Sequence, residues 1–80
     1  MLEVTVEYFA LFRECAGKTS EPWACASAQA ADLFEALRGR YRFPLDKNKV
    51  LLAVNDEFAS WENPLRPGDR VAFLPPVSGG

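Results

Sequence analysis

The first residues of the chain alternate between apolar and polar side chains. The apolar ones fall at every second position, with acidic or hydroxyl side chains between them: Leu2, Val4, Val6 and Tyr8, separated by Glu3, Thr5 and Glu7. A period of two places successive side chains on opposite faces of a strand, so this segment predicts a strand with one buried and one solvated face. Residues 9–17 then space their apolar side chains over one or two helical turns and end in Gly17, which predicts a short helical connector.

The next two segments predict a strand followed by the main helix. Residues 20–26 contain Trp23 and Cys25 on alternate positions, and Pro22 places this strand at an edge because proline cannot donate to a sheet ladder. Ser27 is a candidate helix cap, and Pro44 requires the helix to end before it, near residues 40–43. Between them the apolar side chains recur every three or four residues, as in a helix with one buried face: Ala30, Leu33, Phe34, Leu37 and Tyr41.

The second half of the chain predicts three more strands. Residues 50–54 form a continuous apolar run that stops at Asn55-Asp56, a pair suited to a tight turn, and residues 57–59 can pair back as a short strand. A loop with a turn at Pro67-Gly68 precedes the last strand, residues 70–74. This order predicts an α+β fold in which one main helix packs across one face of a mixed sheet and leaves the other face open.

Length and composition narrow the class of protein. Eighty residues form one domain, residues 1–80, and a chain this short cannot wall off a large internal pocket, which disfavours a self-contained enzyme. The net charge of −2 lacks the basic excess that drives phosphate binding, so we expect no nucleic-acid partner. Without histidine the chain has no Ser-His or Cys-His pair, and Cys15 and Cys25 alone make a poor metal site. We expect no bound metal and interpret both cysteines as structural thiols.

Neither the start of the chain nor its hydropathy suggests export or membrane insertion. The first residues lack a basic segment followed by an apolar stretch. No apolar run approaches the length needed to span a bilayer, roughly 20 residues. We therefore expect a cytoplasmic protein without membrane contact.

The C-terminal residues predict a tail that leaves the sheet. Pro75 and Pro76 cannot donate to a ladder and fix φ, so residues 75–80 should form a stiff segment that ends in a free Val77-Ser78-Gly79-Gly80. Gly79 and Gly80 lack side chains, so a partner enzyme could draw them through a narrow channel and use the terminal carboxylate as the reactive group. Activation of a carboxylate needs ATP from another protein, because this chain has no phosphate-cradling loop. A terminal Gly-Gly is weak support by itself, since chain ends are often small and disordered.

Residues 68–80, GDRVAFLPPVSGG, resemble the C-terminal signature of the molybdopterin synthase small subunit, the MoaD family. Further likeness lies in Tyr8-Phe9-Ala10 and in Ala53-Val54-Asn55, so it spans nearly the whole chain. The family has the ubiquitin-like β-grasp fold, which agrees with the element order above. Arg70 departs from the pattern, because the family more often has an acidic residue there.

The resemblance implies a sulfur-transfer cycle at Gly80. An adenylating enzyme of the MoeB type would adenylate Gly80 with ATP, and a sulfur donor protein would convert it to a thiocarboxylate. The large subunit, of the MoaE type, would hold the catalytic side chains and receive the sulfur on cyclic pyranopterin monophosphate. This chain would then be the sulfur-donating subunit of a transferase complex, with no stably bound cofactor. The alternatives are a carrier of another pathway, such as the thiamine type, and a ubiquitin-like modifier joined to protein lysines.

Strand alternation also predicts where partners dock. If Val71 and Phe73 face the helix, Leu74 faces away and is exposed. We select Phe9, Phe58 and Leu74 as interface candidates, because exposed apolar side chains usually mark a binding site. The tail residues complete the predicted partner-binding set: Pro75, Pro76, Val77 and Ser78. The alternative for Phe9, Phe58 and Leu74 is a place in the core.

Overall fold

Five strands form one mixed sheet in a computed structural model that describes residues 2–76. The strand order is β2-β1-β5-β3-β4, with β1 and β5 parallel at the centre and the other neighbours antiparallel. The strands are β1 (Leu2–Tyr8), β2 (Ser20–Cys25), β3 (Leu51–Val54), β4 (Glu57–Ala59) and β5 (Arg70–Leu74). The predicted mixed sheet is confirmed, and β2 lies at an edge as Pro22 indicates.

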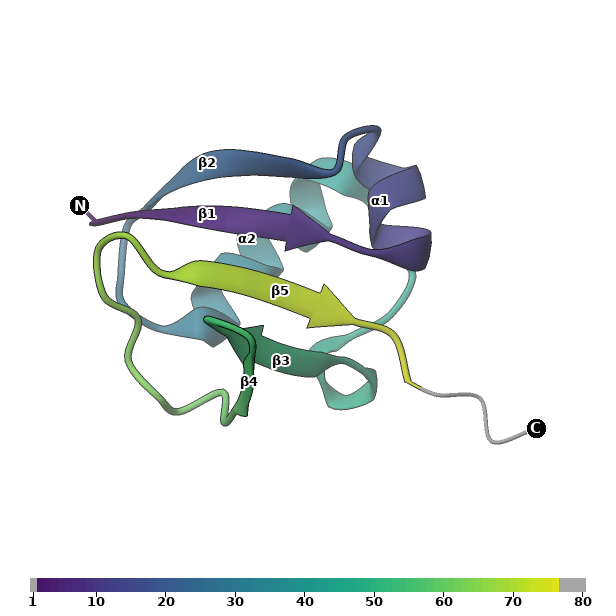
Figure 1. The fold of residues 1–80 in the computed structure, drawn as a ribbon. Helices are drawn as coiled ribbons and strands as arrows, with labels where there is room; N and C mark the ends of the chain where they lie inside the picture. Colours follow the sequence, from purple (N-terminus) through teal and green to yellow (C-terminus); the bar gives the residue numbers. More distant parts are fainter. Residues whose placement is uncertain (1, 77–80) are drawn as a thin grey trace.

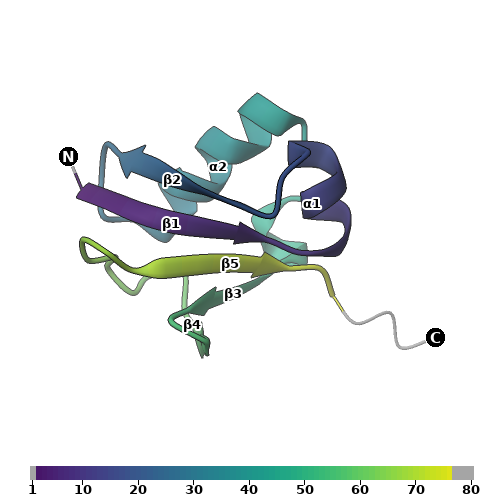
Figure 2. The ribbon, with the colours of Figure 1, turned by 45° about the horizontal axis from the view of Figure 1, so that its top comes forward.

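One main helix covers one face of this sheet. Helix α2 (Ala30–Tyr41) crosses behind the strands, and α1 (Ala10–Ala16) lies at the end of the sheet where β1 stops (Figures 1 and 2). Gly17 ends α1 in the left-handed region, at φ 76°, as a C-terminal glycine does. A single 3₁₀ turn, η1 (Lys47–Lys49), was not predicted from the sequence. Within residues 2–76, no helix combines the length and the apolar character needed to cross a membrane.

The core lies between the sheet and α2, where the alternating side chains of the strands meet the apolar face of the helix. Val4, Val6 and Tyr8 are at most 1% exposed, which confirms the inward face of β1. The rings of Phe12 and Phe34 pack edge to face in the same layer, and aromatic pairs of this kind stabilise beyond the area they bury. Of the five apolar positions expected from the helical spacing, Tyr41 is half-buried and the other four are buried: Ala30, Leu33, Phe34 and Leu37.

The start of α2 differs from the expectation. The helix begins at Ala30 with Gln29 as its N-cap, and no side chain caps it, so the prediction of Ser27 as the cap is wrong. The Ser27 hydroxyl instead accepts the backbone N–H of Gln29 and donates to the Asp32 carboxylate. A serine that bonds two residues ahead forms its own turn, and the helix can start only after that turn.

Two turns bring the start of β5 beside the β3–β4 hairpin. Asn55 and Asp56 both lie in the left-handed region, with φ of 53° and 72°. A two-residue hairpin turn requires this backbone conformation. The Asn55 side chain donates to Asp69 and accepts the backbone N–H of Arg70, and Gly68, at φ 87°, completes the loop that delivers β5. Asp56 and Arg70 are therefore held close together at one end of the sheet.

Candidate partner-binding face

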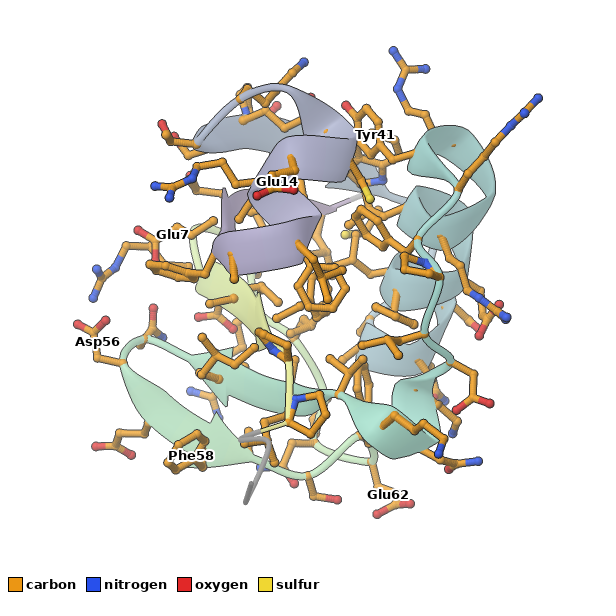
Figure 3. All side chains as sticks on the ribbon, turned by 90° about the vertical axis from the view of Figure 1, so that its right-hand side faces the viewer. Glu7, Glu14, Tyr41, Asp56, Phe58 and Glu62 are labelled. Atoms are coloured by element: carbon orange, nitrogen blue, oxygen red, sulfur yellow. The ribbon has the colours of Figure 1, made fainter. Side chains whose placement is uncertain are left out.

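The face of the sheet opposite α2 carries a row of short side chains flanked by two larger ones. Strand register places Glu7 opposite Ala72, Ala72 opposite Ala53, and Ala53 opposite Phe58. The row therefore crosses four strands, from β1 to β4. Figure 3 shows Glu7, Asp56 and Phe58 along the same side of the molecule. The structure confirms the predicted open face, which has two alanines at its centre with Glu7 on one side and Phe58 on the other.

A hollow of about 200 Å³ lies over this row. Ala53 and Ala72 form its floor, because their side chains end at Cβ. Phe9 and Leu74 stand at the end where β1 and β5 stop, and the other end is bounded by Asp56 and the first residue of β5. The full lining is Glu7, Phe9, Ala53, Asp56, Phe58, Arg70, Ala72 and Leu74. We call these eight residues the open-face hollow.

The structure brings the three predicted interface residues together in this hollow. Phe58 is 73% exposed and Phe9 is 43% exposed, so neither belongs to the core. Leu74 is half-buried rather than exposed, because it lies at the end of β5 between two neighbouring strands, but it too is outside the core cluster. The prediction that Leu74 is exposed is therefore wrong, and so is the core alternative for all three residues. That the three line one hollow was not predicted.

The chain leaves the sheet immediately beside the hollow. Strand β5 ends at Leu74, and Pro75 and Pro76 follow in no helix or strand, with Pro75 half-buried and Pro76 exposed. The prolines therefore end the ladder as predicted. The remaining predicted site residues lie outside the described part of the chain: Val77, Ser78, Gly79 and Gly80.

An ion pair bounds the hollow at the end away from the tail. The Arg70 guanidinium lies 2.6 Å from an Asp56 carboxylate oxygen. The hydrogen bond and the negative charge of Asp56 raise the pKa of Arg70, and the charge of Glu7 adds to this effect. Because both side chains of the pair are largely exposed, it organises the rim of the hollow and contributes little to stability.

Several residues of this face were not singled out from the sequence. Leu51 is 44% exposed and pairs with Leu74 at the base of the tail. The apolar run of residues 50–54 conceals this position, because it shows no polar residue to mark an outward face. Ala53 and Ala72 were not selected, because a methyl side chain carries no group that marks a binding site. The one available clue was alternation around Leu52, which places residues 51 and 53 on the face opposite to it.

A carboxylate on the helix side holds a second polar cluster. Glu21 accepts hydrogen bonds from the hydroxyls of Tyr8 and Tyr41, and Lys18 lies 3.2 Å away. Burial raises the pKa of Glu21, but the hydrogen bonds from Tyr41, Tyr8 and Lys18 outweigh it and leave that pKa below its ordinary value. Burial and the bond to Glu21 raise the pKa of Tyr8 well above its usual range. This cluster joins β1, β2 and the end of α2.

The two cysteines differ in their surroundings. Both are free, with Cys15 half-buried and Cys25 buried. Burial raises the pKa of the Cys25 thiol, which keeps it protonated and weakly nucleophilic. Among residues 2–76, no group of three or more acidic or cysteine side chains is arranged to hold a metal ion.

Comparison with known proteins relates the chain to one family over almost its whole length. The ThiS family matches residues 6–80. The molybdopterin synthase sulfur carrier subunit of Escherichia coli is 40% identical over 96% of this chain and 99% of its own length.

Solved structures with similar folds carry related names. A Pyrococcus furiosus protein described as a candidate subunit 1 of molybdopterin converting factor has a TM-score of 0.81 at 34% identity, covering 96% of this chain and 100% of its own. The small archaeal modifier protein 1 of Methanosarcina acetivorans has a TM-score of 0.79 at 26% identity, covering 100% and 98%. Subunit 1 in a complex with subunit 2 of the Helicobacter pylori molybdopterin-converting factor shares the fold, with a TM-score of 0.69 at 22% identity over 99% and 100% of the chains. The chain therefore belongs to the ThiS/MoaD family of ubiquitin-like β-grasp domains.

Proposed function

We propose that this chain is the sulfur carrier of a molybdopterin synthase and that Gly80 carries the sulfur. The observation that carries the proposal is the near-full-length relationship to a sulfur carrier subunit, 40% identical over 96% of the chain. The match to the ThiS family runs to Gly80, so it includes the terminal Gly-Gly. The location of the open-face hollow beside the tail exit supports a protein that offers its terminus to a docked partner.

The proposed chemistry begins with activation of the Gly80 carboxylate. A carboxylate oxygen attacks the α-phosphorus of ATP and releases pyrophosphate, which leaves an acyl-adenylate. Hydrosulfide supplied by a sulfur donor protein then displaces AMP and leaves a thiocarboxylate. The adenylating enzyme, of the MoeB type, must bind the ATP, because this chain has no phosphate-cradling loop. We expect these steps in the cytoplasm, where ATP is available.

The second half of the cycle takes place on the large subunit, of the MoaE type. The thiocarboxylate sulfur attacks a carbon of cyclic pyranopterin monophosphate and forms a C–S bond, while a C–O bond at that carbon breaks and the oxygen leaves with the electron pair and takes up a proton. Water then cleaves the acyl–sulfur bond. Sulfur stays on the pterin, and the Gly80 carboxylate is regenerated for another cycle. The large subunit supplies the substrate pocket and the catalytic side chains, so this chain is the sulfur-donating component of a transferase with no catalytic centre of its own.

Docking is assigned to the open face and the tail. Phe9, Phe58 and Leu74 present apolar surface beside the tail exit, and burying such surface is the usual source of affinity. Pro75 and Pro76 stiffen the start of the tail, which lowers the ordering cost when a channel takes it up. Within the channel, Val77, Ser78 and Gly79 are the contacts that lead to Gly80.

An intact-mass measurement tests the chemistry directly. The protein is incubated with ATP, an adenylating enzyme and a sulfur donor, or with cell extract that contains them. The expected result is a mass gain equal to replacement of one oxygen by sulfur, localised to Gly80. A variant lacking Gly80 is the control and should keep its mass. An unchanged mass of the full chain, in an extract that modifies a known carrier, contradicts the proposal.

Two related functions remain as second candidates. The likeness to a small archaeal modifier protein, at 26% identity, favours a protein modifier joined to lysines through Gly80. Immunoblots would then show a ladder of conjugates that disappears when Gly80 is deleted.

The match to the ThiS family favours a carrier of the thiamine type. Loss of thiamine synthesis, with molybdenum cofactor synthesis retained, in a strain lacking this chain would support that candidate.

A further inference from the structure

The open-face hollow has a floor and a charge pattern that constrain what can dock there. We propose that it receives one large apolar side chain from the adenylating enzyme that takes up the C-terminal tail, and that this enzyme places a lysine or arginine opposite Glu7. The proposal rests on the proposed function, since it describes the partner that takes up Gly80.

The floor is deep enough for an inserted side chain. Ala53 and Ala72 face each other across β3 and β5, and they are 8% and 7% exposed. Any larger residue at either position would fill the space above them. The hollow holds about 200 Å³. In another protein, a cavity of about 150 Å³ is large enough to admit benzene. A leucine, methionine or phenylalanine side chain therefore fits.

The walls favour insertion over flat contact. Phe58 projects on one side, 73% exposed, and Phe9 with Leu74 closes the end next to the tail. A flat partner resting on these larger side chains would leave the space above the alanines empty. Atoms that line an empty space lose their dispersion contacts, so a complementary side chain gives the better-packed interface. The apolar walls select a hydrocarbon or aromatic side chain rather than a polar one.

The rim carries two carboxylates and one guanidinium. Arg70 and Asp56 neutralise each other at 2.6 Å. Glu7 forms no ion pair with any side chain in residues 2–76, although it lines the same hollow. Covering this carboxylate without a partner would remove its hydration at large cost. The charge of Arg70 also acts on Glu7, but one guanidinium cannot neutralise two carboxylates, and the rim keeps a net negative charge. A docked surface that covers the hollow must therefore bring a cation toward Glu7, which also steers the encounter.

The insertion of a partner side chain is tested with a substitution at the floor of the open-face hollow and a matched control. Ala72→Leu fills the hollow, and Ala36→Leu adds the same side chain on the exposed face of α2, outside the hollow. Binding of the adenylating enzyme to each variant is measured by calorimetry, after thermal unfolding has shown that each is folded. Ala72→Leu should weaken binding at least about tenfold, and Ala36→Leu should bind as the wild type does. Equal affinity of the two variants for the enzyme would contradict the proposal that a side chain of the enzyme inserts into the hollow.

The charge part is tested on β1. Glu7→Lys should weaken binding at least about tenfold at low salt, and the loss should shrink as ionic strength rises. Glu3→Lys makes the same charge change on the same strand outside the hollow, and should have little effect. If Glu7→Lys and Glu3→Lys weaken binding equally, the proposal that the enzyme places a cation opposite Glu7 is wrong.

The wild-type protein separates failure of this inference from failure of the proposed function. If the wild type binds the enzyme and gains sulfur while Ala72→Leu and Glu7→Lys bind equally well, the sulfur-carrier function stands and the inference is wrong. If the wild type neither binds nor becomes adenylated, with the enzyme active on its own carrier, the proposed function is contradicted and this inference falls with it.

Discussion

The two faces of the sheet are built from the same strands but have opposite contents. Phe73 is fully buried against α2, whereas Leu74, the next residue, lies beside the open-face hollow. Phe58, on the open face, is 73% exposed. One face is filled with large aromatic side chains in contact with each other, and the other has alanines at its centre and apolar residues around them. The period of two in the strands thus divides the apolar residues into one set that stabilises the fold and another left available for recognition.

Two phenylalanines on opposite faces give the strongest test of this comparison. Phe73→Ala should destabilise by about 3–5 kcal/mol, because it leaves a cavity among Phe12, Phe34 and Trp61. Phe58→Ala should change the free energy of unfolding by no more than about 0.5 kcal/mol, since the side chain is mostly in solvent. Urea unfolding followed by circular dichroism measures both. Similar losses for the two variants would break the distinction between the faces.

The next effect concerns the polar cluster on the helix side. Glu21→Ala removes the acceptor of the Tyr8 and Tyr41 hydroxyls. Leaving the buried Tyr8 hydroxyl without a partner should cost about 1–3 kcal/mol. Glu35→Ala is the control, because Glu35 is exposed and its ion pair with Arg38 spans 3.5 Å. Its effect should stay within about 0.5 kcal/mol. Equal losses in urea unfolding would show that the cluster does not hold β2 to the helix.

The same carboxylate predicts a pH dependence. The folded pKa of Glu21 is lowered from its ordinary value of 4.5. Its contribution to stability is therefore present above the unfolded pKa and is lost as pH falls through the folded value. Compared with Glu21→Gln, which does not titrate, the wild type should lose stability below the unfolded pKa. Unfolding free energies of both proteins at pH 7, 5, 4 and 3 measure the difference. A constant difference across this range would contradict the shift.

The smallest expected effect lies on the open face. Asp56→Asn removes the charge that pairs with Arg70, but both side chains are largely in solvent. The thermal unfolding temperature should therefore not change measurably, since exposed ion pairs contribute little. A clear loss of stability would mean that the rim of the hollow also supports the fold.

Much of the fold was predictable because it follows local patterns. The alternation in residues 2–8, the helical spacing from Ala30 to Leu37 and the turn at Asn55-Asp56 each appear within a few neighbouring residues. The start of α2 was less predictable, because Ser27 can serve as a helix cap or form its own turn. The structure has the turn, in which the Ser27 hydroxyl accepts the backbone N–H of Gln29, and the helix begins only at Ala30.

The candidate site was predictable in part for a related reason. Leu74 was selected from strand alternation, Phe9 from its place at the end of the first strand, and Phe58 from its short strand after a turn. Each lines the hollow on the open face. Their neighbours Ala53, Ala72 and Leu51 were not selected, because a small residue or a member of an apolar run shows no local sign of a binding role.

The sequence by itself determined the strands and helices, the division of apolar residues between the two faces, and the terminal Gly-Gly that the family match includes, since these depend on residues close together in the chain. Only the tertiary structure decided that Glu7, Ala72, Ala53 and Phe58 form one row. The row depends on the register of four strands, of which β1 is far from the other three in the sequence. Side-chain packing across the whole sheet sets that register. The hollow and its charges exist only once β1 and β5 lie side by side.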